Sequence, residues 1–184
     1  MNLPIPIALT RLVARTDGSV PRESWYRMQE CAPDWIEKAP FLYQHTIRLP
    51  FDPERAFDLV VDPRLEAEWF PNFRSARWHG TPGVGAIREY QLSYLRLIEH
   101  FTTWRRGERF SFWVSSSSLP LTRRFQEDYA FRADGTGTIV SWRVGYEPEE
   151  VLRPLHPILR PFFAQDFRTA ADRLAKLGAR LAKR

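Results

Sequence analysis

Hydrophobic and polar residues alternate through much of the chain after residue 41, a pattern that predicts β-strands. The segments with this pattern are residues 42–49, 75–79, 86–92, 95–104, 109–115, 122–132 and 138–146. From the second segment onward, short turn sequences such as residues 105–108 and 133–137 separate consecutive strands. Strands joined by such short connections run antiparallel, so the pattern predicts one antiparallel sheet of about seven strands.

Two short helices are predicted between the first strand and the second. Asp52 and Asp62 each stand directly before a proline, and aspartate in that position accepts hydrogen bonds from the free amides of a first helical turn. Pro71 ends the second helix, because the residue before a proline avoids helical geometry. The apolar positions at helical spacing are Ala56, Phe57, Val60 and Val61 in the first helix and Leu65, Trp69 and Phe70 in the second.

The C-terminal segment predicts one long amphipathic helix that begins at about Phe162, after the prolines at positions 154, 157 and 161. Its apolar face consists of Phe163, Phe167, Ala170, Leu174, Leu177 and Leu181. The opposite face consists of Arg168, Asp172, Arg173, Lys176, Arg180 and Lys183. We expect the apolar face to lie across the concave face of the sheet.

Residues 1–41 show little periodicity and are expected to form an N-terminal extension that packs on the domain of residues 42–184. Residues 17–19 have the composition of a turn. Residues 24–28 are expected to form a short helix, and residues 34–38 a further helical turn after Pro33.

The order of these elements resembles the START-like, or helix-grip, superfamily, which includes the birch-pollen allergen and polyketide cyclase/dehydrase-type proteins. The resemblance covers about residues 42–184. It rests on four segments in order: FDPERAF at residues 51–57, EWFP at 68–71, GVGA at 83–86 and GTGTIVSW at 135–142. It implies an α+β helix-grip fold, in which a curved antiparallel sheet wraps a long C-terminal helix and two short helices follow the first strand.

Composition narrows the class of protein. Of the 184 residues, 43% are hydrophobic and 27% charged, as in globular proteins generally. The single cysteine, Cys31, has no partner for an internal disulfide, which favours a reducing compartment, so we expect a cytoplasmic protein. No stretch reaches the ~18 apolar residues that span a bilayer. Residues 3–9 are short and interrupted by proline, so we do not interpret them as a signal peptide.

Basic residues outnumber acidic ones mainly at the C-terminal end. Residues 148–184 hold eight basic and four acidic residues, whereas residues 45–147 hold fourteen and thirteen. An excess confined to one helix does not indicate a nucleic-acid-binding domain, so nucleic acid is not an expected partner. The simplest interpretation is a solvated helix face, and contact with a membrane or an acidic partner is the minor alternative.

No motif indicates a metal, a cofactor or a covalent nucleophile. His45, His79, His100 and His156 lie on separate elements without the spacing of a metal site. Cys31 has no histidine near it in the sequence, and the chain has no Gly-x-Ser-x-Gly elbow. The glycine-rich segments 80–85 and 134–137 connect strands and precede no helix, so they are interpreted as turns. We therefore expect no metal and no cofactor.

Three charged residues stand on predicted strands at positions that share a face with apolar neighbours. These are Arg88, Glu99 and Glu127. A buried charge needs either a partner or a ligand. One interpretation is that an Arg–Glu pair satisfies itself near the rim, or that a different register leaves these groups in water. The other interpretation is that they are polar anchors that orient a ligand in an apolar pocket.

Aromatic residues make up 14% of the chain, and by the resemblance part of them line a ligand cavity between the sheet and the long helix. A cavity of this kind implies a hydrophobic small molecule as the partner. The candidate ligand-binding residues are Trp69, Arg88, Tyr90, Glu99, Phe101, Phe112, Glu127, Tyr129, Trp142, Phe163 and Phe167.

Three functional hypotheses follow. The first is a binding module for a hydrophobic small molecule of lipid, polyketide or isoprenoid type. The second is a polyketide cyclase/aromatase-type enzyme, in which the Arg, Tyr and Glu residues of the pocket polarise a carbonyl or move a proton. The third is an interaction protein whose basic helix docks on a membrane or partner. A pocket carboxylate serves orientation and acid–base chemistry equally, so the residues alone do not separate the first two hypotheses.

Overall fold

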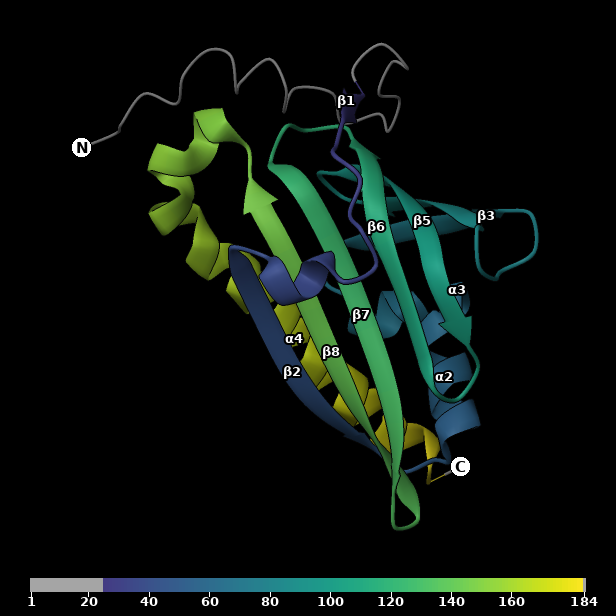
Figure 1. The fold of residues 1–184 in the computed structure, drawn as a ribbon. Coiled ribbons are helices and arrows are strands. Elements are labelled where there is room, and N and C mark those ends of the chain that lie inside the picture. Colours follow the sequence, from purple (N-terminus) through teal and green to yellow (C-terminus); the bar gives the residue numbers. More distant parts are fainter. Residues whose placement is uncertain (1–24, 184) are drawn as a thin grey trace.

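A curved antiparallel sheet and one long helix dominate the computed structural model, which describes residues 25–183 (Figure 1). The strands are β1 (Tyr26–Arg27), β2 (Phe41–Leu49), β3 (Phe73–His79), β4 (Ile87–Leu92), β5 (Arg96–Arg105), β6 (Arg109–Ser117), β7 (Thr122–Asp134) and β8 (Gly137–Pro148). The helices are η2 (Trp35–Lys38), α2 (Pro53–Val61), α3 (Pro63–Trp69), η3 (Glu150–Leu155) and α4 (His156–Leu181).

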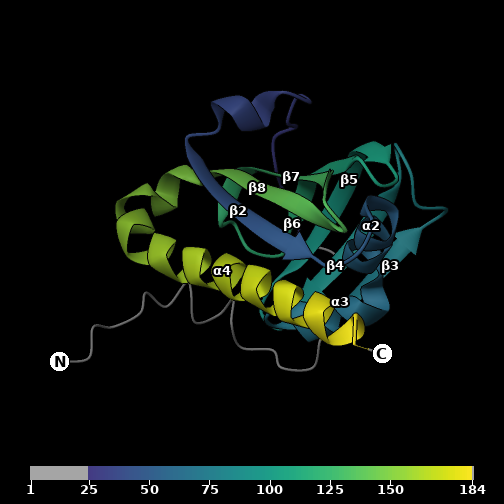
Figure 2. The ribbon, with the colours of Figure 1, turned by 90° about the horizontal axis from the view of Figure 1, so that it is seen from below.

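The strand order is β2-β8-β7-β6-β5-β4-β3, and β1 pairs with the end of β6. Every pair is antiparallel, including β2 with β8, the first and last long strands. Helix α4 crosses the concave side of the sheet, as the view from below shows (Figure 2). The predicted α+β helix-grip fold is therefore confirmed, with β1 as an eighth strand.

The two short helices begin where the aspartate–proline pairs predict. The Asp52 carboxylate accepts a hydrogen bond from the Arg55 amide at 2.9 Å, and the Asp62 carboxylate accepts one from the Arg64 amide at 2.9 Å. Each cap satisfies a backbone N–H that has no partner inside its helix. Helix α3 then packs against α4 and β3, which brings the C-terminal end of α3 to the edge of the core.

The C-terminal half of α4 lies directly on β2. Ala170 and Leu174 are fully buried there, and a Cβ atom at Gly178 would lie only 2.7 Å from Cδ2 of Leu49. Glycine is therefore required at this position for the helix to approach the strand so closely. The N-terminal half of α4 carries larger side chains, among them Phe163 and Phe167, toward the same face of the sheet.

The expectation that α4 begins at about Phe162 is wrong, because the helix begins at His156. Pro157 lies in the first turn, where its missing N–H has no helical partner to lose. Pro161 lies farther inside, where it removes one helical hydrogen bond. Tertiary contacts outweigh this loss, since the Nε2 atom of His156 lies 2.8 Å from the hydroxyl oxygen of Tyr146.

The expectation of a short helix at residues 24–28 is also wrong in the part that the structure describes, because Tyr26–Arg27 is a strand. β6 pairs with β7 only from Arg109 to Trp113, so the last residues of β6 have no partner strand on the β7 side apart from β1. The chain around β1 fills this gap by pairing with Ser116 and Ser117. So short a sequence does not hold a helix by itself.

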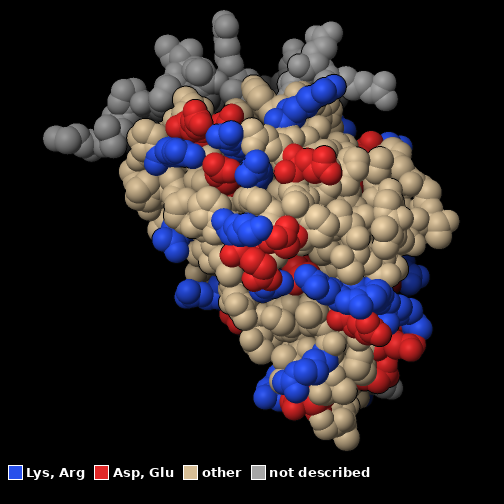
Figure 3. Space-filling view, viewed as in Figure 1, with Lys and Arg blue, Asp and Glu red and all other residues tan. Residues whose placement is uncertain are grey.

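Residues 33–38 pack on the convex side of the sheet. The predicted helical turn at residues 34–38 is present as η2, whose Trp35 and Ile36 are buried against β7 and β8. Arg143 on β8 forms ion pairs with Glu37 at 2.6 Å and with Asp128 at 2.9 Å. Figure 3 shows this side, where basic and acidic side chains lie next to one another. The turn expected at residues 17–19 lies outside the described residues.

Replacing Leu174 by alanine is expected to lower the free energy of unfolding by about 2–5 kcal/mol, because the side chain is fully buried under the sheet. Lys176→Ala, on the exposed side of the same helix, is the control and is expected to change it by no more than ~0.5 kcal/mol. Urea denaturation of both variants measures the difference. A loss below ~1 kcal/mol for Leu174→Ala would contradict the role of α4 as a core element.

Candidate functional site

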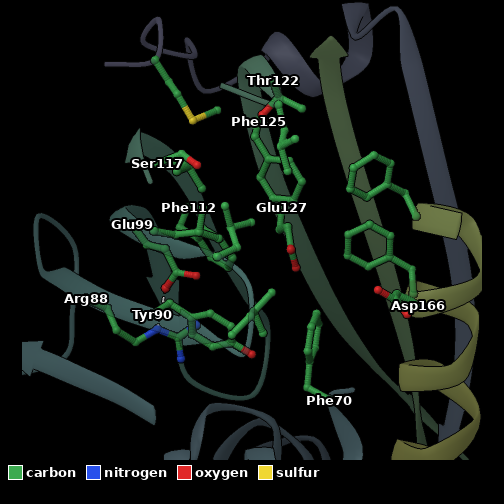
Figure 4. Close-up of a pocket in the computed structure, with 18 of the residues that line it drawn as sticks. Phe70, Arg88, Tyr90, Glu99, Phe112, Ser117, Thr122, Phe125, Glu127 and Asp166 are labelled. Carbon is green, nitrogen blue, oxygen red and sulfur yellow. Dashed lines mark hydrogen bonds and ion pairs between the residues drawn. The ribbon is translucent and has the colours of Figure 1, made fainter. Parts of the chain in front are cut away.

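A cavity lies between the concave face of the sheet and the N-terminal half of α4 (Figure 4). Its volume is about 80 Å³ within the walls and about 790 Å³ with the open mouth included. The enclosed space is therefore narrow and suits a slender molecule. The apolar residues of the wall are Met28, Phe70, Leu92, Leu95, Leu97, Phe112, Val114, Leu121, Phe125, Phe163 and Phe167.

Most of the residues predicted from the sequence lie on this wall, whereas three do not. Trp69, Phe101 and Trp142 are each at most 2% exposed and lie behind the cavity, with their rings packed against other aromatic rings. Those on the wall are Arg88, Tyr90, Glu99, Phe112, Glu127, Tyr129, Phe163 and Phe167. Their role in binding a ligand stays a prediction.

The guanidinium group of Arg88 joins two carboxylates in the cavity wall. Its Nε donates to Oε2 of Glu99 at 2.5 Å, and its Nη1 donates to Oε2 of Glu66 at 3.4 Å. The register of the sheet places Arg88 on β4 opposite Glu99 on β5, while Glu66 comes from α3. The Arg–Glu pair of the first interpretation is therefore present, but it is buried rather than solvated.

Aromatic rings surround the same guanidinium. Its central carbon lies 5.0 Å from the ring centroid of Tyr90, 5.2 Å from Trp78 and 5.3 Å from Phe101. Rings at these distances stabilise a cation through their negative faces. Phe101 thus holds Arg88 in place from behind the wall. The positive charge of Arg88 is enclosed by its own partners before any ligand enters.

Glu127 on β7 is the second polar feature of the cavity. Its Oε2 accepts hydrogen bonds from the Tyr129 hydroxyl and from Nε1 of Trp142, both at 2.8 Å. Tyr129 and Trp142 are cross-strand partners on β7 and β8, and their rings stack with centroids 5.2 Å apart. Trp142 therefore contributes to the site by orienting Glu127 rather than by lining the cavity.

Burial changes the protonation of these carboxyl groups. It raises the pKa of Glu66 to about 7 and the pKa of Glu127 to about 8, because water no longer stabilises the charged forms. Burial also raises the pKa of Glu99, although the adjacent Arg88 opposes that rise. At neutral pH Glu127 is therefore mostly a neutral carboxylic acid, which can donate a hydrogen bond as well as accept one.

Two tyrosines differ in their hydrogen bonding. The Tyr90 hydroxyl is buried in the wall beside the Glu66 carboxyl, and its hydrogen bonding lowers the pKa of that group. The Tyr94 hydroxyl donates to Oδ2 of Asp166 at 3.2 Å, which joins the turn between β4 and β5 to α4 beside the cavity. Tyr90 thus belongs to the polar cluster of Glu66 and Arg88, whereas Tyr94 links two walls of the cavity.

Glu66 and Met28 are wall residues that the sequence analysis missed. Glu66 stands three residues before Trp69 in α3, so the two share a helix face, and this spacing could have indicated that Glu66 points inward. Met28 reaches the cavity because β1 fills the gap beside β6. No sequence pattern signals that placement.

The other candidates for chemistry do not assemble into a site. Burial raises the pKa of Cys31 to about 12, which keeps it a thiol and a poor nucleophile. Within residues 25–183, no group of three His, Cys, Asp or Glu side chains is arranged to hold a metal ion. Ser117 does reach the cavity wall, where its hydroxyl donates to the Leu119 carbonyl oxygen at 2.8 Å.

The outer face of α4 changes character along its length. Arg168, Arg173 and Lys176 are exposed in the C-terminal half, as predicted for the basic face. Ile158 and Phe162 near the start of the helix are 65% and 70% exposed. No helix in the described part of the chain is both long and apolar enough to cross a membrane. Contact of this helix with a membrane surface stays a prediction.

Comparison with known proteins matches this architecture to one family. Residues 41–178 match the family described as polyketide cyclase / dehydrase and lipid transport. A protein of Mycobacterium tuberculosis, described as uncharacterized, is 24% identical over 139 residues, which are 74% of this chain and 83% of that protein.

Solved structures share the fold at low sequence identity. A protein of Thermus thermophilus aligns with a TM-score of 0.64 at 16% identity, over 77% of this chain and 99% of that one. Major latex-like protein 151 of Panax ginseng aligns with a TM-score of 0.56 at 11% identity, over 75% of this chain and 97% of that one. Identities this low establish the common fold alone.

Replacing Arg88 by methionine is expected to lower the free energy of unfolding by about 3–5 kcal/mol, because Glu66 and Glu99 would be left buried without a cation. Combining it with Glu99→Gln is expected to restore part of that loss. The control is Arg77→Met at the exposed pair with Glu89, where we expect a loss of at most ~1 kcal/mol. Equal losses for the two single variants, measured by urea denaturation, would show that the buried pair has no special role.

Proposed function

The chain belongs to the polyketide cyclase / dehydrase and lipid transport family, and we propose that it binds an apolar small molecule of lipid, polyketide or isoprenoid type in the cavity beneath α4. One observation carries the proposal: an apolar cavity with a few buried polar groups lies between the sheet and the N-terminal half of α4. Apolar walls supply affinity through burial, and polar groups in such a site fix the orientation of the ligand.

The narrow free space favours a slender or flat ligand. A bulkier molecule needs the side chains of the mouth to move, and the N-terminal half of α4 supplies two of them, Phe163 and Phe167. Phe163 is only partly buried, so its ring has room to rotate. We infer that the ligand enters between α4 and the turn that carries Tyr94, where the hydrogen bond from Tyr94 to Asp166 joins the two sides.

The second candidate function is a cyclase/aromatase-type enzyme. Glu127 favours it, because a buried carboxyl with a pKa near 8 is suited to donate a proton to a carbonyl oxygen. In this function the apolar walls would fold a polyketide chain, and the carboxyl group of Glu127 would polarise one of its carbonyl groups.

Filling the cavity is expected to abolish binding in either function. Leu97 on β5 lines the cavity and is partly exposed, so Leu97→Trp places a large ring in the free space. We expect an affinity loss of about tenfold or more for the neutral fluorescent probe N-phenyl-1-naphthylamine, with the melting temperature nearly unchanged. Leu181→Trp at the far end of α4 is the control with unchanged affinity. Equal affinity of the wild type and Leu97→Trp would refute the cavity as the binding site.

The enzyme alternative has a separate test. If Glu127 donates a proton during turnover, Glu127→Gln should lower the rate of cyclisation of a poly-β-ketone substrate by about 100-fold, because an amide does not transfer a proton. Binding of the same substrate should persist, since the amide group has nearly the same shape. Product analysis by mass spectrometry measures the rate. Absence of turnover by the wild type over a panel of such substrates would leave the binding module as the function.

A further inference from the structure

The cavity wall contains more carboxyl groups than cations. Glu66, Glu99 and Glu127 all line it, while Arg88 is the one Lys or Arg residue among its wall residues in the described part of the chain. Arg88 is engaged by Glu99 and Glu66, and Glu127 lies apart from them on β7. A carboxylate without a cation is costly to bury, so Glu127 is held more readily as a neutral acid.

The hydrogen bonds of Glu127 determine where its proton resides. Oε2 receives two donors, the Tyr129 hydroxyl and the Trp142 indole N–H. An oxygen that accepts from two donors has no room for a proton of its own. The other oxygen, Oε1, accepts no hydrogen bond from any described residue, so the proton belongs there. Figure 4 shows the carboxyl end of Glu127 directed into the space beside Phe70 and Tyr90.

We propose that Glu127 anchors the ligand as a neutral carboxylic acid, whose Oε1–H donates to a neutral acceptor, such as a carbonyl oxygen, at the polar end of an apolar molecule. This inference rests on the proposed function and specifies its ligand class. The Tyr90 hydroxyl on β4 lies beside Glu66 and is not needed as a second donor. One donor and a surrounding apolar wall match a ketone, ester or similar neutral group.

The other charged groups of the wall disfavour ionic ligands. A ligand carboxylate would lie among four carboxyl groups, and Arg88 already has its partners. A ligand amine would have to displace the proton of Glu127 and lose its own hydration. The ionisable residues that face the cavity are Glu66, Arg88, Tyr90, Tyr94, Glu99, Glu127, Tyr129 and Asp166.

Four probes of similar chain length test the ligand class: methyl octyl ketone, decanoic acid, decylamine and decane. Their competition with the neutral fluorescent probe N-phenyl-1-naphthylamine is measured on the full chain at neutral pH. We expect the ketone to bind about three- to tenfold more tightly than decane, the gain of one hydrogen bond, and more tightly than either ionic probe. Tighter binding of decylamine than of the ketone would overturn the inference in favour of a cationic ligand.

The pH dependence assigns the donor to Glu127. A carboxyl with a pKa near 8 is protonated below that value, so the ketone affinity should fall as the pH rises from about 6 to about 9. Glu127→Gln should keep most of the affinity, because the amide oxygen can accept from Tyr129 and Trp142 while its NH₂ donates into the cavity. The fall in affinity around pH 8 should be lost in this variant, and any dependence left near pH 7 would come from Glu66. Glu127→Leu should lose the advantage of the ketone over decane. Glu89→Gln, on the outer side of β4, is the control and should behave as the wild type.

The outcomes separate this inference from the proposed function. If none of the four probes displaces N-phenyl-1-naphthylamine, or if this reporter binds Leu97→Trp as well as the wild type, both the binding function and the inference fail. If all probes bind in the cavity but the ketone has no advantage over decane, the binding function stands and the inference fails. Unchanged pH dependence in Glu127→Gln would likewise exclude Glu127 as the donor.

Discussion

The packing of α4 across the concave face of the sheet, through small residues at one end and aromatic rings at the other, is the constraint on which the rest of the structure depends. Near the C-terminal end, Gly178 brings the helix close to Leu49. Near the N-terminal end, the Tyr43 hydroxyl of β2 donates to the Arg160 carbonyl oxygen at 3.0 Å, and the Tyr43 ring lies 5.7 Å from that of Phe167. The cavity lies beside this aromatic end of the helix, with Phe163 and Phe167 in its wall.

Charged side chains differ in burial and in partners between the two sides of the sheet. On the convex side, Arg143 joins Asp128 to Glu37, and the exposed ends of such pairs are hydrated. On the concave side, Arg88 is buried with two carboxylates, and Glu127 is satisfied by neutral donors instead of a cation. Keeping these groups buried is costly unless each is paired or protonated. Buried ionisable side chains are typical of ligand-binding sites, and they also occur in ion pairs with a structural role.

The N-terminal segment completes the site from outside the helix-grip core. Its strand β1 fills the gap where β6 and β7 diverge, and Met28 follows directly into the cavity wall. The same segment buries Cys31, Trp35 and Ile36 against the sheet. A part of the chain that precedes the family match at residue 41 therefore shapes the cavity that the family fold provides.

The local patterns of the sequence by themselves determined the long strands and the two aspartate-capped helices, and the resemblance to the helix-grip superfamily supplied their arrangement. Strand period also placed Arg88, Glu99 and Glu127 on a face with apolar neighbours, although an alternative register with these groups in water remained open. Only the tertiary structure decided their partners: Glu66 reaches Arg88 from a helix twenty-two positions earlier in the chain, and Trp142 reaches Glu127 from the next strand. The hydrogen-bond partner of a buried side chain depends on how the helices and strands pack across the core, and local periodicity does not encode that packing.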